Sequence, residues 1–259
     1  MSWFTETFTE FDVAWLLLSS FVATIAGFLS SLMTYRFVTR RKILDKLVME
    51  EEREKKERIR QDVVRWANPI LASVKELRSR LDNILYSAGY LALSKNYESN
   101  VNSNWSISYE YFMNSTLYVF GQYFAWTRMF QEKINFELFE SQKDKDDFLM
   151  AIRNTSKALG SFPPSYSCSG KDTQLFGLQQ RAIGEKFISS EPEQCLKYAD
   201  FLQELENEWF CLIIEPLKSL LENVNPESDC RWKRLEATRQ ALIDLEFQCN
   251  KVLVLPDEP

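Results

Sequence analysis

An uncharged and mostly apolar run of 23 residues, residues 13–35 (VAWLLLSSFVATIAGFLSSLMTY), constrains the fold more than any other segment. A helix rises about 1.5 Å per residue, so about 20 apolar residues cross the hydrocarbon core of a bilayer. The run therefore predicts one transmembrane helix. The alternatives are a cleaved signal peptide and a buried core helix. Four basic residues follow the run at once: Arg36, Arg40, Arg41 and Lys42.

The residues that flank the run distinguish these alternatives and predict its direction. Residues 1–12 carry Glu6, Glu10 and Asp12 but no Lys or Arg, whereas a signal peptide begins with basic residues. The positive-inside rule places the basic side of a span in the cytoplasm. We therefore expect residues 1–12 outside and the C-terminal part in the cytoplasm of a bacterium, or in the stroma beside a thylakoid. The four basic residues are also suited to contact anionic lipid headgroups, at about 1 kcal/mol each.

Composition predicts an all-α fold behind this anchor. The chain has only 7 Gly and 8 Pro in 259 residues, 14% of its residues are aromatic, and no segment alternates with the period of a strand. Few turn residues and many apolar ones favour long helices joined by few loops. We expect residues 36–67 to form a charged helical stalk and residues 68–259 to form a cytoplasmic bundle of about five or six helices.

The stalk is predicted from residues 43–66, where oppositely charged side chains repeatedly lie four positions apart. A dimerising coiled coil is the alternative. Its apolar seam would have to continue past Val48, but the expected positions hold Glu51, Lys55, Arg58 and Asp62. We therefore favour a solvated stalk whose end docks on the following domain through Ile59, Val63 and Trp66.

Apolar periodicity predicts the helices of the domain, with a break or kink at Asn68–Pro69. Residues 117–130 are apolar on nearly all sides, which predicts the central helix of the bundle. A second membrane span there is the alternative, and Asn114, Gln122 and Arg128 make it costly. A further kink is expected at Pro216. The expected helices cover 69–93, 108–140, 143–159, 173–188, 190–223 and 229–251.

Residue types exclude several classes of function. The chain has no histidine, which excludes Ser-His-Asp and Cys-His catalysis and every His-ligated metal site. The net charge is −6, and the basic residues concentrate beside the membrane, so we expect no nucleic-acid partner. Five widely spaced cysteines predict free, mostly buried thiols in a reducing compartment: Cys168, Cys195, Cys211, Cys230 and Cys249.

Two loop motifs have weak chemical interpretations. Residues 169–172 (SGKD) lack the first glycine and the Ser or Thr of a phosphate-binding loop. Cys168 beside them is a reactive-thiol candidate, but an ordinary loop cysteine is the simpler interpretation. The acidic residues within 143–147 (KDKDD) can hold a divalent ion or complement a helix dipole, and we favour the dipole. We expect no metal and no cofactor.

A more informative set consists of polar residues inside amphipathic helices. Buried polar groups need partners, so we expect them to meet in one polar network. That network either fixes helix register or surrounds a cavity for a small, anionic ligand. Arg181 and Glu185 are spaced to pair, and Gly184 allows another helix to approach closely. The set is Arg80, Asn83, Gln122, Arg128, Gln180, Arg181 and Glu185.

Three segments carry a resemblance to known sequences: residues 66–85 (WANPILASVKELRSRLDNIL), 115–126 (STLYVFGQYFAW) and 175–185 (LFGLQQRAIGE). The chain resembles a widespread family of uncharacterised bacterial proteins in which a membrane segment precedes a helical domain. The likeness covers residues 68–190 in patches. It implies a helical domain as one fold unit, and it assigns no activity and no catalytic residue.

These observations favour a non-enzymatic, membrane-tethered helical module. We expect an adaptor, an assembly factor or an accessory subunit of a larger membrane complex, with a protein partner or a second copy beside it. The alternative is a ligand-responsive sensor or effector that uses the region of Arg80, Arg128 and Arg181. A third possibility is an enzyme that uses converging carboxylates or Cys168, although no spacing indicates such a convergence.

Overall fold

The structure, a computed structural model, is all-helical in the residues it describes, which are 3–96, 108–133, 139, 141–161, 174–189, 194–226 and 229–252. Within these ranges the one strand-like feature is an isolated antiparallel bridge between Ile188 and Cys195. The chain divides into two compact units, Met1–Arg58 and Ile59–Pro259. The predicted all-α class is confirmed.

The first unit consists of helix α1 (Trp3–Asp62) up to Arg58. The side chains described in its apolar stretch are all exposed, which argues against a core helix, and among the described residues α1 begins the one helix long and apolar enough to cross a membrane. The hydroxyls of Thr24 and Thr34 donate to the carbonyls of Ser20 and Ser30, at 2.7 and 2.8 Å. Polar groups in hydrocarbon must be satisfied internally, so these bonds suit a spanning segment.

The second unit begins with the last residues of α1. Ile59 packs against the core, and Val63 and Trp66 are only 4% and 5% exposed. The prediction that these three side chains dock onto the domain is confirmed.

A π-helical turn, η1 (Val63–Ala67), leads directly into α2 (Asn68–Tyr86). Pro69 has no N–H to donate, and it lies in the first turn of α2. The backbone N–H of Asn68 bonds to the carbonyl of Val63, which is the wider hydrogen-bond spacing of a π turn. The irregularity expected at Asn68–Pro69 is therefore a change of helical winding, and the chain stays helical through it.

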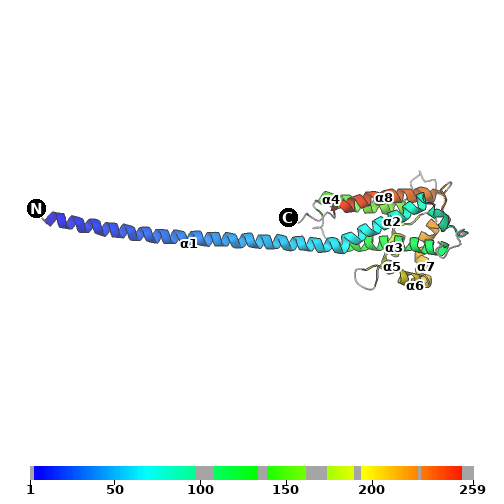
Figure 1. Cartoon of the computed structure of the whole chain (residues 1–259), viewed down its shortest axis with the longest axis horizontal. Coiled ribbons are helices and arrows are strands. Elements are labelled where there is room, and N and C mark those ends of the chain that lie inside the picture. The colour runs from blue at the N-terminus through cyan, green and yellow to red at the C-terminus, as the bar shows by residue number, and fades with distance from the viewer. Residues whose placement is uncertain are drawn as a thin grey trace. The chain divides into compact units, whose positions relative to one another are not determined.

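Two groups of helices build the rest of the second unit (Figure 1). Helix α8 packs against α4 and α2, and α3 packs against α2 and α5. The shorter α6 and α7 contact α3 on the side of α5. Helix α3 therefore lies between one group, formed by α2, α4 and α8, and a second group, formed by α5, α6 and α7. The remaining elements are η2 (Gly89–Leu93), α3 (Tyr109–Lys133), α4 (Gln142–Gly160), α5 (Gly177–Phe187), α6 (Tyr198–Glu204), α7 (Glu208–Leu221) and α8 (Cys230–Val252).

Helix α3 carries much of the core, including Phe120, Tyr123 and Phe130. It meets α5 at unusually close range through two glycines. A Cβ on Gly184 would lie 2.8 Å from the carbonyl oxygen of Phe124, and one on Gly121 would lie 2.3 Å from the ring of Phe187. The close approach predicted at Gly184 is confirmed. The alternative of a second span at 117–130 finds no support, since α3 does not qualify as a membrane-crossing helix.

The predicted helix over 69–93 is wrong at its C-terminal end. Helix α2 stops at Tyr86, Ala88 adopts a left-handed conformation with φ 59°, and the chain continues in the 3₁₀ turn η2. Gly89 is required there, because a Cβ on it would lie 2.8 Å from the carbonyl oxygen of Asn83. The helix ends where the chain folds back over its own last turn.

The single helix predicted over 190–223 is also wrong, since the structure has two helices, α6 and α7, in its described part. Asn207 separates them and caps α7, its side-chain oxygen accepting from the N–H of Trp209 at 3.0 Å. Pro216 lies inside α7 as predicted. The helix start expected at residues 190–193 lies outside the described residues.

Candidate functional site

The polar residues singled out in the sequence lie in three separate places. Arg128, Gln180 and Arg181 line one hollow, Arg80 and Asn83 line another, and Gln122 belongs to neither. Gln122 donates to the hydroxyl of Tyr118 at 2.9 Å, and that hydroxyl donates to the carbonyl of Leu196 at 2.9 Å. The expected single network is therefore divided between two hollows and one hydrogen-bond chain, which links α3 to the segment between α5 and α6.

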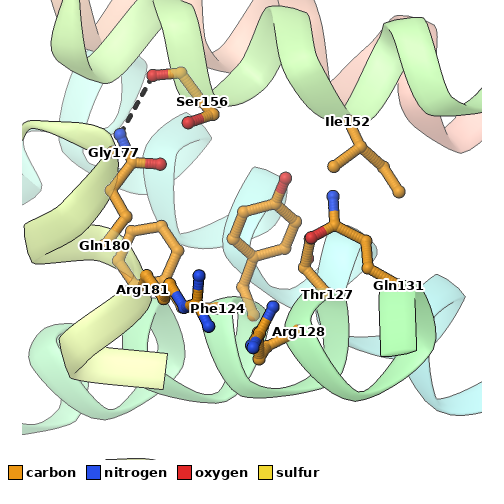
Figure 2. A pocket seen from close by; sticks show the side chains of 10 residues that line it. Phe124, Thr127, Arg128, Gln131, Ile152, Ser156, Gly177, Gln180 and Arg181 are labelled. Carbon is orange, nitrogen blue, oxygen red and sulfur yellow. Dashed lines mark hydrogen bonds between the residues drawn. The ribbon is translucent and has the colours of Figure 1, made fainter. Parts of the chain in front are cut away.

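The first hollow, which we call the α3–α5 hollow, has a volume of about 230 Å³ and lies among α3, α4 and α5 (Figure 2). Figure 2 shows the side chains of Arg128 and Arg181 near each other, with Gln180 beside Ser156. The lining residues are Tyr123, Phe124, Thr127, Arg128, Gln131, Ile152, Ser156, Gly177, Gln180 and Arg181.

Both arginines of the α3–α5 hollow already have carboxylate partners. Arg181 donates to Glu185 at 2.8 Å, which confirms the predicted pair, and Arg128 lies 3.7 Å from the same carboxylate. Arg128 also pairs with Glu132. The hydrogen bond from Arg181 lowers the pKa of Glu185, so this carboxylate stays charged at neutral pH. A ligand anion would have to compete with Glu132 and Glu185 for these guanidinium groups.

The inner wall of the α3–α5 hollow is structural. The amide of Gln180 is buried and donates to the carbonyls of Ser156 and Leu175 at 3.0 and 2.7 Å, which ties α5 to α4. Burial raises the pKa of Tyr123 to about 12, so its hydroxyl stays protonated at neutral pH. The neutral phenol of Tyr123 and the hydrogen-bonded amide of Gln180 supply no general base and no nucleophile at neutral pH.

The second hollow, which we call the α2–α3 hollow, has a volume of about 420 Å³. The guanidinium carbon of Arg80 lies 4.8 Å from the centre of the Phe112 ring. Burial lowers the pKa of Arg80, against the opposing influence of Tyr111 and Glu76. The hollow is lined by Glu76, Ser79, Arg80 and Asn83 from α2 and by Tyr111, Phe112 and Val119 from α3.

A surface of a different kind lies on α7. One face of this helix is core, with Phe210, Ile214 and Leu217 buried. On another face Trp209 and Leu212 are 74% and 65% exposed, three residues apart and therefore adjacent on the helix. We call these two side chains the α7 face. Exposed apolar residues of this size, side by side, are typical of surfaces that bind another protein.

Sequence reasoning missed two arginines at the start of α8. Arg234 is fully buried and donates to the carbonyls of Ala158, Leu159 and Ser161, at 2.8 to 3.0 Å, at the end of α4. Arg231 donates to the carbonyls of Ser219 and Glu222 at the end of α7, at 2.7 and 2.9 Å. Both side chains satisfy carbonyls that lack partners within their own helix. No local sequence signal reveals such caps, because the helix ends that they cap are distant in the chain.

The cysteines correct one prediction. Cys195, Cys211 and Cys249 are free, but Cys230 is disulfide-bonded, so the expectation that all the thiols are free is wrong for Cys230. Burial raises the pKa of Cys195 and of Cys249 to about 12, which keeps both thiols protonated and unreactive. Cys168, the reactive-thiol candidate, lies outside the described residues, as does the motif at 169–172.

The acidic motif at 143–147 starts helix α4. Ser141 caps the helix by accepting from the N–H of Asp144 at 3.2 Å, and the Asp144 carboxylate pairs with Lys251. Across the described part of the chain, no group of three or more Cys, Asp or Glu side chains is placed to hold a metal ion. In the first unit, the four basic residues proposed for lipid contact are exposed along α1.

Comparison with known proteins leaves the geometry as the only guide to function. No protein-family model, no curated protein and no solved structure matches this chain. The resemblance of three segments to a bacterial family therefore stays a prediction.

Proposed function

We propose that this chain is a non-enzymatic, membrane-tethered helical module that acts as an adaptor, assembly factor or accessory subunit of a larger membrane complex. The α7 face is the observation that carries the proposal. Trp209 and Leu212 expose apolar side chains to water on one face of α7, while another face of the same helix packs against the core. Tryptophan is also among the residues that contribute most to binding energy at protein interfaces.

The proposal includes a position and a direction. Residues 13–35 cross the bilayer once as a retained helix, residues 1–12 lie outside, and the helical bundle lies in the cytoplasm. The exposed apolar stretch of α1 supports the span, and the basic side of that stretch supports the direction. The partner is a membrane protein or a second copy of this chain.

Co-purification tests the α7 face directly. The full chain, extracted in mild detergent from its own membrane, is expected to retain a protein at fixed stoichiometry, and the double variant Trp209→Ser/Leu212→Ser is expected to lose it. Phe247→Ser is the matched control, because Phe247 is an equally exposed apolar residue on another helix, α8. A wild-type chain that purifies as a partner-free monomer would overturn the proposal.

A second candidate function is a ligand-responsive sensor or effector, and the two polar hollows favour it. Each hollow combines at least one arginine with hydroxyl or amide side chains. Small anions would be recognised by such groups. A thermal-shift screen of carboxylate and phosphate compounds on the full chain tests this candidate, and the absence of any stabilisation would remove it.

A further inference from the structure

Arg80 differs from the other partly buried arginines of the α2 and α3 helices. Arg78, two residues earlier, pairs with Asp82 at 3.3 Å and with Glu246 at 2.7 Å. Arg128 pairs with two carboxylates. Arg80 has no ion pair and no hydrogen bond to any described residue, and its guanidinium lies over the face of the Phe112 ring.

This arrangement leaves the hydrogen-bonding groups of Arg80 available. A guanidinium carries five N–H donors in one plane, and contact with an aromatic face occupies none of them. Arg80 is half-buried, so its guanidinium loses part of its hydration without gaining a counter-ion, and that loss carries a modest free-energy cost. An oxyanion placed in the plane of the guanidinium would offset that cost with short, charge-assisted hydrogen bonds.

The α2–α3 hollow supplies the rest of a site. Ser79, Asn83 and Tyr111 bring one hydroxyl, one amide and one phenol to the same space, and Phe112 and Val119 bring apolar surface. The volume of about 420 Å³ suits a small molecule. We propose that the α2–α3 hollow binds an oxyanion, the carboxylate or phosphate group of a small molecule or lipid headgroup, with Arg80 as its main donor.

Glu76 opposes the binding of an anion in this hollow, and its replacement therefore provides a second test of the proposal. It lines the same hollow one helical turn before Arg80, which is the favourable order for an ion pair, yet the two side chains are not paired. Its negative charge disfavours a bound anion. Removing that charge is therefore expected to strengthen binding, whereas in the α3–α5 hollow Glu132 and Glu185 neutralise both arginines directly.

The inference deepens the ligand-binding candidate and is independent of the α7 face. The experiment is calorimetric titration of inorganic phosphate and of acetate into the full chain, held in phosphatidylcholine nanodiscs at constant ionic strength. Arg80→Gln is expected to weaken binding at least about tenfold, and Glu76→Gln to strengthen it about threefold. Arg153→Gln, a change at an exposed arginine of α4, and Arg181→Gln in the α3–α5 hollow are expected to leave it unchanged.

Loss of binding in Arg80→Gln can be distinguished from loss of folding. Arg80→Gln removes a charge that has no carboxylate partner, so the variant is expected to melt no earlier than wild type without ligand. Arg80→Lys keeps the charge but loses the planar fork, and it is expected to bind with intermediate affinity.

Phosphatidylglycerol nanodiscs distinguish the two sources of the anion. If wild type binds phosphate more weakly in these nanodiscs than in phosphatidylcholine nanodiscs, and Arg80→Gln shows no such difference, the site binds a lipid headgroup. If the affinity of wild type is the same in both, the site binds a soluble anion. Equal binding by wild type and Arg80→Gln overturns the inference, and loss on Arg181→Gln instead would leave the sensor candidate standing at the other hollow. If neither phosphate nor acetate binds wild type, the inference fails, and the thermal-shift screen of larger carboxylate and phosphate compounds decides the sensor candidate separately.

Discussion

At the scale of single residues, two arginines at the start of α8, Arg231 and the fully buried Arg234, satisfy backbone carbonyls at the ends of other helices. Arg234 shows this most clearly, because its fully buried side chain donates to the carbonyls of Ala158, Leu159 and Ser161. The last carbonyls of any helix lack partners in that helix, and burying them unpaired costs free energy. Through these hydrogen bonds, Arg234 joins α8 to the end of α4.

Replacing Arg234 by Met should therefore destabilise the domain strongly. Methionine fills similar space but leaves buried carbonyl oxygens without donors, at a cost of about 3 kcal/mol in the free energy of unfolding. Urea denaturation of the full chain in detergent measures this change. Arg153→Met is the control, since Arg153 is exposed on the same helix, α4, whose end Arg234 caps. A loss below about 1 kcal/mol for Arg234→Met would contradict the capping role.

Glu222 makes the stability of the domain depend on pH. It accepts from the hydroxyl of Tyr109 and from the amine of Lys95, the latter at 2.9 Å. Burial alone would raise the pKa of Glu222, but these two donors outweigh it and hold the pKa below the ordinary value of 4.5. The contribution is therefore fully present above pH 4.5 and is lost as the pH falls through the lower pKa of the folded state.

The variant Glu222→Gln tests this dependence. It should cost about 1 kcal/mol at neutral pH, because the acceptor loses its charge, so the ion pair with Lys95 is lost and the hydrogen bond from Tyr109 weakens, at a partly exposed site. It should also flatten the fall of the unfolding free energy below pH 4.5 relative to wild type. Denaturation curves collected at several pH values compare the two slopes, and parallel slopes would show that Glu222 is not the titrating group.

At the scale of elements, the crossing of α3 and α5 depends on the absence of two side chains. Gly184 lets α5 lie against the backbone of α3 at Phe124, and Gly121 accommodates the ring of Phe187. Close backbone approach of this kind fixes the relative position of two helices, since neither can move without opening a void. Gly184 thereby fixes the position of α5 against Phe124, one of the residues that line the α3–α5 hollow.

Gly184→Ala should be destabilising although alanine is the better helix former. Its Cβ would meet the carbonyl oxygen of Phe124 at 2.8 Å, and overpacking of this kind costs about 2 kcal/mol, more than the helix propensity gained. Gly177→Ala is a matched control on the same helix, because a Cβ there meets nothing within 4 Å. Thermal melting should show a clear decrease for the first variant and no decrease for the second. Equal melting temperatures would mean that the helices move apart without cost.

The sequence predicted the long helices well and the short ones poorly. Helices α4 and α8 begin and end within about one residue of the predicted ranges, because each follows a clear boundary, Ser141 for α4 and the Asn225–Pro226 break for α8. The end of α2 was missed because Ala88 has no intrinsic preference for its left-handed conformation, which arises where the chain folds back over Asn83. The division into α6 and α7 depends on Asn207, a capping residue that lies among Glu204, Glu206 and Glu208, and glutamates fit a continuous helix equally well.

At the scale of the whole molecule, the structure arranges the polar residues selected from the sequence differently from the single network that we expected. Apolar periodicity shows which positions of a helix are off the core, and that was enough to select Arg80, Arg128 and Arg181. It does not show which neighbour each helix faces. Helix α3 packs against α2 and also against α5, so polar residues on α2 and α5 fall into different hollows.

Two features of the whole chain lead to opposite predictions about the compartment of the domain. Arg36, Arg40, Arg41 and Lys42 follow the apolar run, which places the domain in the cytoplasm by the positive-inside rule. The free thiols of Cys195, Cys211 and Cys249 agree with a reducing compartment. The disulfide at Cys230 points the other way, because such bonds persist mainly in oxidising compartments.

We expect the basic residues to decide the direction, because charge next to a span acts during insertion, before any disulfide forms. Thiols of intact cells should be blocked with a small permeant maleimide at lysis, and the chain should then be run on a non-reducing gel beside Cys230→Ser. Identical mobility of the two is the expected result, and it means that Cys230 is reduced in the cell. Protease added to intact spheroplasts should likewise leave residues 59–259 uncut. A mobility shift that only wild type shows, together with cleavage of the domain from outside, would reverse the orientation and make the disulfide a permanent part of the fold.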